Sequence, residues 1–244
     1  MEIDLTKAEA NFYIMSREKD HKYHFEMQDI ELHIPITILE DAVFERMMSK
    51  RLNLPISYNI TTKQVHDFPI LMGQNSFTSS FPFPNNTAPT RCIIGFVRQS
   101  SYNGTQTTNP FNFLRKFGQC YLENLQLMLN QHTIGSLEAD QTKDHCLIDY
   151  YRLNQYLAFT DTPFSNSISY ADFCGGSYFK IYDLSTSGSS CEPFIQSVTR
   201  NGQYKLVIRF SAPLPFEVVC LLFCDYSGTL SYNKANKIQL SYVT

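Results

Sequence analysis

The chain has 244 residues, 43% of them hydrophobic, with 19 Phe and 15 Tyr, and it carries 20 Lys and Arg against 23 Asp and Glu. The length fits one large all-β domain, and the apolar fraction is enough to form a core. A formal net charge of −3, with no basic run longer than two residues, argues against direct sequence-specific binding of nucleic acid, because phosphate neutralisation requires clustered Lys and Arg.

Neither a signal peptide nor a membrane span is expected. The amino terminus has no positively charged region before an apolar stretch, and no segment approaches about 20 apolar residues. The seven cysteines are irregularly spaced and are expected to be reduced. Cys174 and Cys191 are the pair that could approach across a hairpin. Sequons at Asn59, Asn85 and Asn103 would stay unused in a chain that folds in the cytosol or nucleus.

The first part of the chain predicts strands and one helix. Alternation of apolar residues changes phase near Asp29, which predicts a bulged strand over residues 23–36. Thr37 and Glu40 have the spacing of a capping box and predict a helix that ends near residue 54. Strands are then predicted over residues 56–60 and 65–72, and a loop over residues 76–90.

The rest of the chain is mostly strand. Strands are predicted over residues 92–97, 121–129, 178–184, 203–210 and 217–225, with a final pair over 230–243 and helices over 144–159 and 167–173. Uneven strand spacing argues against a parallel α/β sheet. We therefore predict an all-β fold, a jelly-roll sandwich of two antiparallel sheets with one or two short helical insertions. It would be a single domain, with residues 1–20 as an amino-terminal arm or linker and 21–244 as the jelly roll.

No catalytic, cofactor-binding or metal-binding residue is assigned, and the chain is not expected to be an enzyme. His21 and His24 would point to opposite faces of a strand, so they cannot share one ion. Cys220 and Cys224 share a face but lie about 13 Å apart, which favours core packing.

The stretch from Glu138 through Asp140 and Asp144 to Asp149 lacks a calcium-loop pattern and is interpreted as a solvated loop and helix start. Asp144-His145-Cys146 and Gly175-Gly176-Ser177 match no nucleophile motif.

Residues 89–113 combine an apolar strand, a turn and an aromatic anchor. Asn103-Gly104 suits a tight turn with positive φ. Asn109 is pushed into an extended conformation by Pro110, after which Phe111 and Phe113 are expected to bury their rings at the sheet edge. The residues we single out as structural landmarks are Arg91, Gly95, Asn103, Gly104, Asn109, Pro110, Phe111, Phe113, Tyr182 and Asp183.

These residues belong to an ordered series of short motifs along the chain. The series runs through residues 89–97, 102–105, 109–113, 134–140, 150–153, 168–172, 176–184, 201–202 and 206–215. From about Phe12 to the end, it resembles the carboxy-terminal half of the double jelly-roll major capsid proteins of Maverick/Polinton elements and adintoviruses. Relatives carry two jelly rolls in one chain, and Met1 stands about where the second would begin.

The resemblance implies a transposon-derived or viral structural protein without a catalytic site or cofactor. Such a protein is a capsid building block that self-assembles into a shell, as a trimer and with other capsid proteins. It implies a location in the virion after synthesis in the host cytoplasm or nucleus, without secretion.

Two other functions remain open from the sequence. A stand-alone or host-repurposed binding module, lectin-like or receptor-binding, could use the Tyr- and Asn-rich loops over residues 81–87 and 102–108. A cupin-type enzyme would need clustered metal-binding histidines. The six histidines are instead scattered, as His21, His24, His33, His66, His132 and His145.

Overall fold

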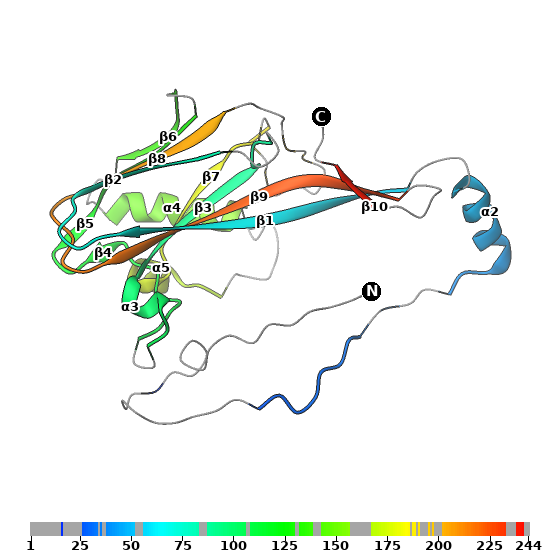
Figure 1. Ribbon diagram of the computed structural model, residues 1–244, viewed down its shortest axis with the longest axis horizontal. Coiled ribbons are helices and arrows are strands. Elements are labelled where there is room, and N and C mark those ends of the chain that lie inside the picture. The colour runs from blue at the N-terminus through cyan, green and yellow to red at the C-terminus, as the bar shows by residue number, and fades with distance from the viewer. Residues whose placement is uncertain are drawn as a thin grey trace.

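The computed structural model describes residues 16, 26–33, 35, 38–51, 56–82, 87–105, 108–129, 132–138, 143–156, 167–185, 187–188, 190, 195, 197, 202–232 and 238–241. The helices in these ranges are α2 (Asp41–Arg51), α3 (Gln99–Tyr102), α4 (Lys143–Tyr156) and α5 (Tyr170–Gly176) (Figure 1). The strands are β1 (Ile56–Ile70), β2 (Ser76–Pro82), β3 (Arg91–Arg98), β4 (Lys116–Phe117), β5 (Cys120–Leu129), β6 (His132–Glu138), β7 (Phe179–Asp183), β8 (Gln203–Phe210), β9 (Val218–Tyr232) and β10 (Ile238–Ser241).

The strands pair antiparallel in two sheets. One sheet has the order β1-β9-β3-β7, with β10 also paired to β9. The other has the order β2-β8-β5-β4, with β6 also paired to β5. Without the short β4 and β10, successive strands alternate between the sheets except at the β5–β6 hairpin, as in a jelly roll. The predicted jelly-roll sandwich is confirmed. The described part holds four helices, of which α3 was not predicted.

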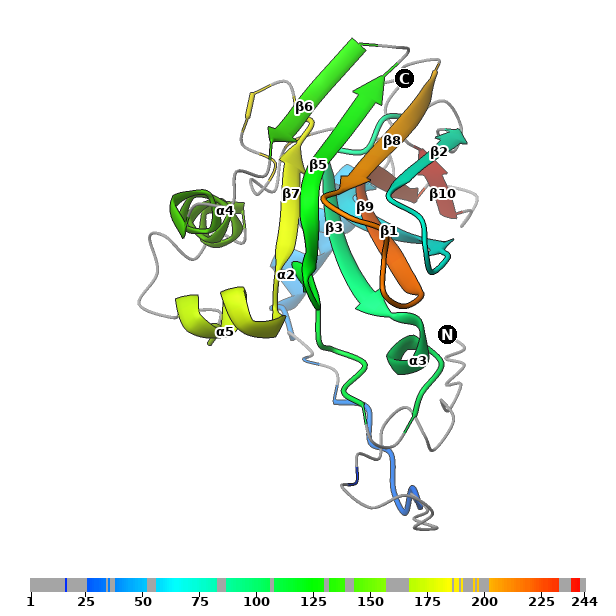
Figure 2. The ribbon, with the colours of Figure 1, turned by 90° about the vertical axis from the view of Figure 1, so that its left-hand side faces the viewer.

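The main core lies between the two sheets. In β8, buried Tyr204, Leu206, Ile208 and Phe210 alternate with more exposed positions, which is the pattern of a sheet with one face on the core. β3 is apolar on both faces because a second cluster covers its outer side, where Val97 packs with Val219 and Leu221. Figure 2 shows α4 and α5 together on the β7 side of the sandwich.

β1 and β9 form a ribbon longer than the sandwich. They pair over fifteen positions, from Ile56 opposite Tyr232 to Ile70 opposite Val218. β3 accompanies β9 only from Val218 to Asp225, so the rest of β9 pairs with β1 and β10. The ribbon extends from the sandwich toward α2 (Figure 1).

Several predicted elements differ from the structure. Residues 26–33 are not in a strand, so the bulged strand predicted there is wrong for the described residues; alternation alone makes no strand without a partner to take its hydrogen bonds. Residues 76–82, predicted as loop, form β2, which pairs with β8. The two strands predicted over 56–72 are one strand, β1. α2 begins at Asp41, with the N–H of Val43 and Phe44 donating to the carbonyl of Glu40. No helix among the described residues is long and apolar enough to cross a membrane.

Candidate functional site

β3 continues into a short helix and a turn. α3 follows β3 directly, and the N–H of Asn103 donates to the carbonyl of Gln99 at 2.9 Å. Gly104 then adopts a φ of +76°, in the left-handed region that glycine enters without steric cost. The predicted turn is confirmed at Gly104, whereas Asn103 keeps a helical φ of −74°.

The chain then returns along β3 through a second turn. The side-chain Oδ1 of Asn109 accepts the N–H of Phe111 at 2.8 Å, which closes an Asx turn. Pro110 is buried, but the Phe111 side chain is 62% exposed. The expectation that both rings are buried is therefore wrong for Phe111, because the turn sets Pro110 against the body of the protein and leaves the next side chain outside.

Phe113 is the anchor of this returning segment. Its N–H donates to the carbonyl of Gly176 at 2.7 Å, and its carbonyl accepts the N–H of Tyr178 at 3.2 Å. Its ring lies 4.3 Å from that of Phe179, centroid to centroid, and covers Gly95. A Cβ on Gly95 would lie 2.7 Å from the Phe113 ring, so the absent side chain is what allows the ring to approach. Phe113 thus joins β3 to the start of β7.

Arg91 and Asp183 hold the opposite end of β3 and β7. Arg91 forms an ion pair with Asp225 of β9, in which its Nε–H donates to Oδ2 at 2.9 Å. The Asp183 carboxylate accepts the N–H groups of Ser185 at 2.9 Å and Ser190 at 3.0 Å, which shapes the loop after β7. These two landmarks are paired across β3 and β7 in the backbone register, but their side chains bind different partners.

A buried polar group lies where α4 meets β7. Lys180 donates to Oδ1 of Asp149 at 2.5 Å, and the Tyr178 hydroxyl donates to Oδ2 of the same carboxylate at 2.8 Å. Burial lowers the pKa of Lys180, against the opposing effect of the Asp149 charge. Burial and the same carboxylate raise the pKa of Tyr178 above its ordinary value. Tyr182 lies on the same face of β7, and its hydroxyl donates to the carbonyl of Leu125 in β5 at 2.8 Å.

This group was not found from the sequence, where Asp149 was interpreted as solvated. That interpretation is wrong, because the Asp149 side chain is only 3% exposed. A signal was present in the spacing: Cys146, Asp149 and Leu153 recur at helical intervals, and all three are buried. The buried state of Cys220 and Cys224, by contrast, confirms the core packing that was predicted for them.

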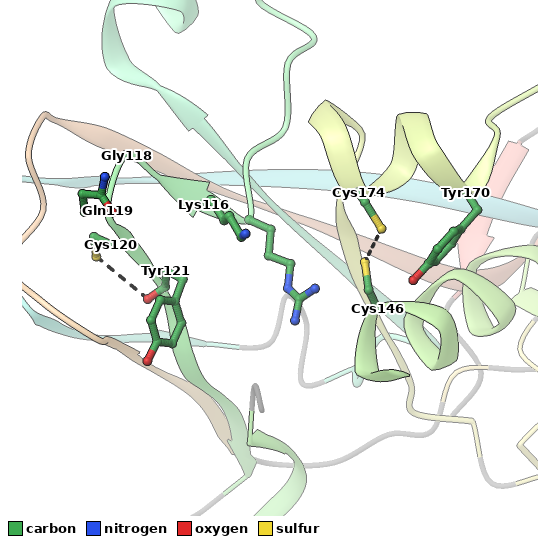
Figure 3. Close-up of a pocket in the computed structure, with 9 residues that line it drawn as sticks. Lys116, Gly118, Gln119, Cys120, Tyr121, Cys146, Tyr170 and Cys174 are labelled. Atoms are coloured by element: carbon green, nitrogen blue, oxygen red, sulfur yellow. Dashed lines mark hydrogen bonds between the residues drawn. The ribbon is translucent and has the colours of Figure 1, made fainter. Parts of the chain in front are cut away.

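A cleft of about 420 Å³ lies beside α4 and α5 (Figure 3). Its walls include Arg115 and Lys116 from the β4 region, and Cys146 and Cys174 from the two helices. The two sulfur atoms lie 2.8 Å apart. Cys191, the partner predicted for Cys174, lies outside the described residues.

In the parts of the chain that the structure describes, no three His, Cys, Asp or Glu side chains are placed to hold one metal ion. His33 pairs with Glu31, and His66 of β1 packs on the Phe81 ring. His21, His24 and His145 lie outside the described side chains. The contacts of the sequence-selected landmarks Arg91, Phe113 and Tyr182 join neighbouring strands and loops of the fold.

The fold is similar to three solved structures. PBCV-1 VP54, from a crystal structure fitted into a cryo-EM reconstruction of the virophage Sputnik, aligns with a TM-score of 0.52 at 10% identity, over 84% of this chain and 55% of that chain. A chain of the Sputnik virophage cryo-EM structure aligns with a TM-score of 0.45 at 15% identity, over 79% and 40%. The mavirus major capsid protein gives 0.43 at 8% identity, over 77% and 41%.

By its strand order, the fold of this chain is a jelly roll. The structural match to VP54 is consistent with the resemblance to double jelly-roll capsid proteins seen in the sequence. The chain spans about half the length of the structures it matches, 55%, 40% and 41%. No family model and no curated protein matches it.

Proposed function

We propose that this chain is a jelly-roll building block of a viral capsid, equivalent to the second half of a double jelly-roll major capsid protein. The observation that carries the proposal is the jelly-roll fold, which aligns with VP54 over 84% of the chain at a TM-score of 0.52. The ordered motifs of the sequence support the same assignment, and Phe113, Gly95 and Arg91 serve in it as scaffold. The whole chain would act as one domain, made in the cytoplasm or nucleus without secretion and incorporated into a virion derived from a Maverick/Polinton or adintovirus-like element.

Self-association, most simply as a trimer, is part of this proposal. α2 carries Val43, Phe44 and Met47 on one face, with 45%, 51% and 54% of their surface exposed. Side chains three and four apart on a helix lie together, and an exposed apolar stripe on a helix is typical of a surface that another chain covers. A second copy of this chain is the partner we propose for that stripe.

Sedimentation velocity of the whole chain, from low to high micromolar concentration, tests this function. We expect trimers, and we expect Phe44→Asp with Met47→Asp to weaken association. Glu45→Gln is the matched control, because Glu45 is an exposed polar residue of the same helix and lies away from the apolar stripe. A strict monomer at high micromolar concentration would contradict the assembly role. A monomer that also gives a clear hit on a glycan array would favour the binding module instead.

A further inference from the structure

Two cysteines from neighbouring helices meet in the lining of the cleft. Cys146 of α4 is buried and Cys174 of α5 is exposed, and their sulfur atoms lie 2.8 Å apart (Figure 3). A disulfide bond is about 2.05 Å long, so a movement of about 1 Å would bring the two atoms to bonding distance. We propose that Cys146 and Cys174 form a reversible disulfide that joins α4 to α5, closed by reaction with a small anionic disulfide such as glutathione disulfide.

The two helices are already held together without the bond. The Tyr150 ring of α4 lies 5.4 Å from the Phe173 ring and 5.6 Å from the Tyr170 ring of α5, centroid to centroid. The Tyr150 hydroxyl also donates to the carbonyl of Ile168, just before α5, at 2.8 Å. Because these contacts fix the spacing of the helices, the disulfide can close and open without rearranging the fold.

Access separates this pair from the other close pair of thiols. Cys92 and Cys224 face each other across β3 and β9 with their sulfur atoms 3.5 Å apart, but both residues are fully buried. An oxidant in solution therefore reaches Cys174 and not Cys92 or Cys224. Cys92 and Cys224 therefore serve as an internal control, because their sulfur atoms are close together but solvent does not reach them.

The cleft suits an anionic peptide disulfide. Its volume of about 420 Å³ lies within the range of small-molecule sites. Arg115 and Lys116 on its wall supply positive charge, and glutathione disulfide carries a net negative charge from its carboxylates. The nearby Arg115 charge also opposes the burial that raises the pKa of Cys146 to about 12.

The reaction balances as two thiol–disulfide exchanges. The exposed Cys174 thiolate attacks one sulfur of glutathione disulfide, which forms a Cys174–glutathione bond and releases one glutathione thiolate. Cys146 then loses its proton to solvent and attacks Cys174 Sγ, which releases the second glutathione thiolate. Overall, two protein thiols are oxidised to one disulfide, and one glutathione disulfide is reduced to two glutathione molecules.

The test treats the folded, full-length chain with glutathione disulfide, then blocks free thiols under denaturing conditions and maps disulfides by mass spectrometry. We expect one product, a cross-link between Cys146 and Cys174, with Cys92, Cys120 and Cys224 remaining as free thiols. Added dithiothreitol should reverse it. The inference does not depend on the proposed capsid function, so it can fail while assembly is observed, and the reverse also holds.

Two variants give the order of the steps. Cys146→Ser should accumulate a stable Cys174–glutathione adduct, and Cys174→Ser should leave Cys146 unmodified. Lys116→Gln should slow cross-linking by glutathione disulfide more than cross-linking by the neutral hydroxyethyl disulfide. Three results would each overturn the proposal. They are a Cys174–glutathione adduct that persists in the wild-type chain, oxidation of Cys92 and Cys224 at the same rate as Cys146 and Cys174, and no modification of any cysteine.

Discussion

The Asp149–Lys180 pair is where a small chemical change should have its largest effect on stability. In Asp149→Asn the shape is kept, and Tyr178 retains an oxygen to which it can donate. Lys180 loses the only counter-charge described for it, the carboxylate oxygen 2.5 Å from its Nζ. Its side chain is 2% exposed, so water cannot replace that charge in the folded state. The expected outcome is that folded Asp149→Asn holds Lys180 as a neutral amine.

The cost of this neutralisation follows from the lysine pKa. Removing a proton at pH 7 from a group whose unfolded pKa is about 10.4 costs about 4.6 kcal/mol, at 1.36 kcal/mol per pH unit. Breaking a buried ion pair by removing one partner costs about 3–5 kcal/mol in other proteins. The two estimates agree, so we expect Asp149→Asn to lose about 3–5 kcal/mol of unfolding free energy at pH 7.

The pH dependence identifies the cause. Between pH 7 and 8.5 the unfolded Asp149→Asn chain binds a proton at Lys180 that the folded chain lacks, so its stability rises with pH by about 1.4 kcal/mol per unit relative to wild type. Lys180→Met should also destabilise the fold, because it leaves the Asp149 carboxylate buried without its counter-charge.

Urea unfolding followed by circular dichroism, at several pH values, measures this slope. The double variant Asp149→Asn with Lys180→Met is the control, because it removes both charges and should not show it. A loss below about 1 kcal/mol in Asp149→Asn, or the same pH dependence as wild type from pH 7 to 8.5, would refute the claim that the pair is buried and ionic.

Three further predictions concern stability. Gly95→Ala should cost about 1–3 kcal/mol in chemical unfolding, because its methyl group would lie 2.7 Å from the Phe113 ring, and Phe113→Leu in the same chain should recover part of the loss. The reduced protein should lose stability as pH rises above about 9, because burial raises the pKa of Cys146 to about 12 and that of Tyr178 above its ordinary value; constant stability from pH 8 to 11 would contradict this. Cys146 and Cys174 are 28 positions apart in the sequence, so closing the disulfide between them should add about 3–4 kcal/mol to the unfolding free energy. It should also raise the melting temperature by about 10 °C, which differential scanning fluorimetry with and without reductant measures.

Strands that bury one or both faces were predictable from the sequence. β8 has the predicted bounds, from Gln203 to Phe210, because alternate apolar residues are a direct consequence of a sheet with one buried face. β3 and β5 were found for similar reasons, and the α4 helix within a few residues of its ends. β2 was missed because its segment is rich in Ser and Phe without clear alternation, and pairing with β8 makes it a strand.

The polar contacts were harder to predict, because they depend on which segments the topology brings together. Lys180 lies between Tyr178 and Tyr182 at alternating positions of a predicted strand, and nothing local indicated a carboxylate partner. Asp149 is 31 residues away in sequence. Cys146 and Cys174 meet only because α4 and α5 pack on the same side of the sandwich. The strand order of the two sheets likewise depends on long-range pairing.

Perturbed titratable groups often indicate an active site, and among the described residues two such sets involve side chains of α4 about one helical turn apart. Asp149, Lys180 and Tyr178 are buried and do not line the cleft, so no substrate could reach them there. Cys146 does line the cleft, and its partner Cys174 is exposed. The ion pair therefore serves to fix α4 on β7, and the thiols are the groups of this region available for chemistry with molecules in solution. This division fits a scaffold whose helical layer is held by a permanent buried contact and a second, redox-dependent one.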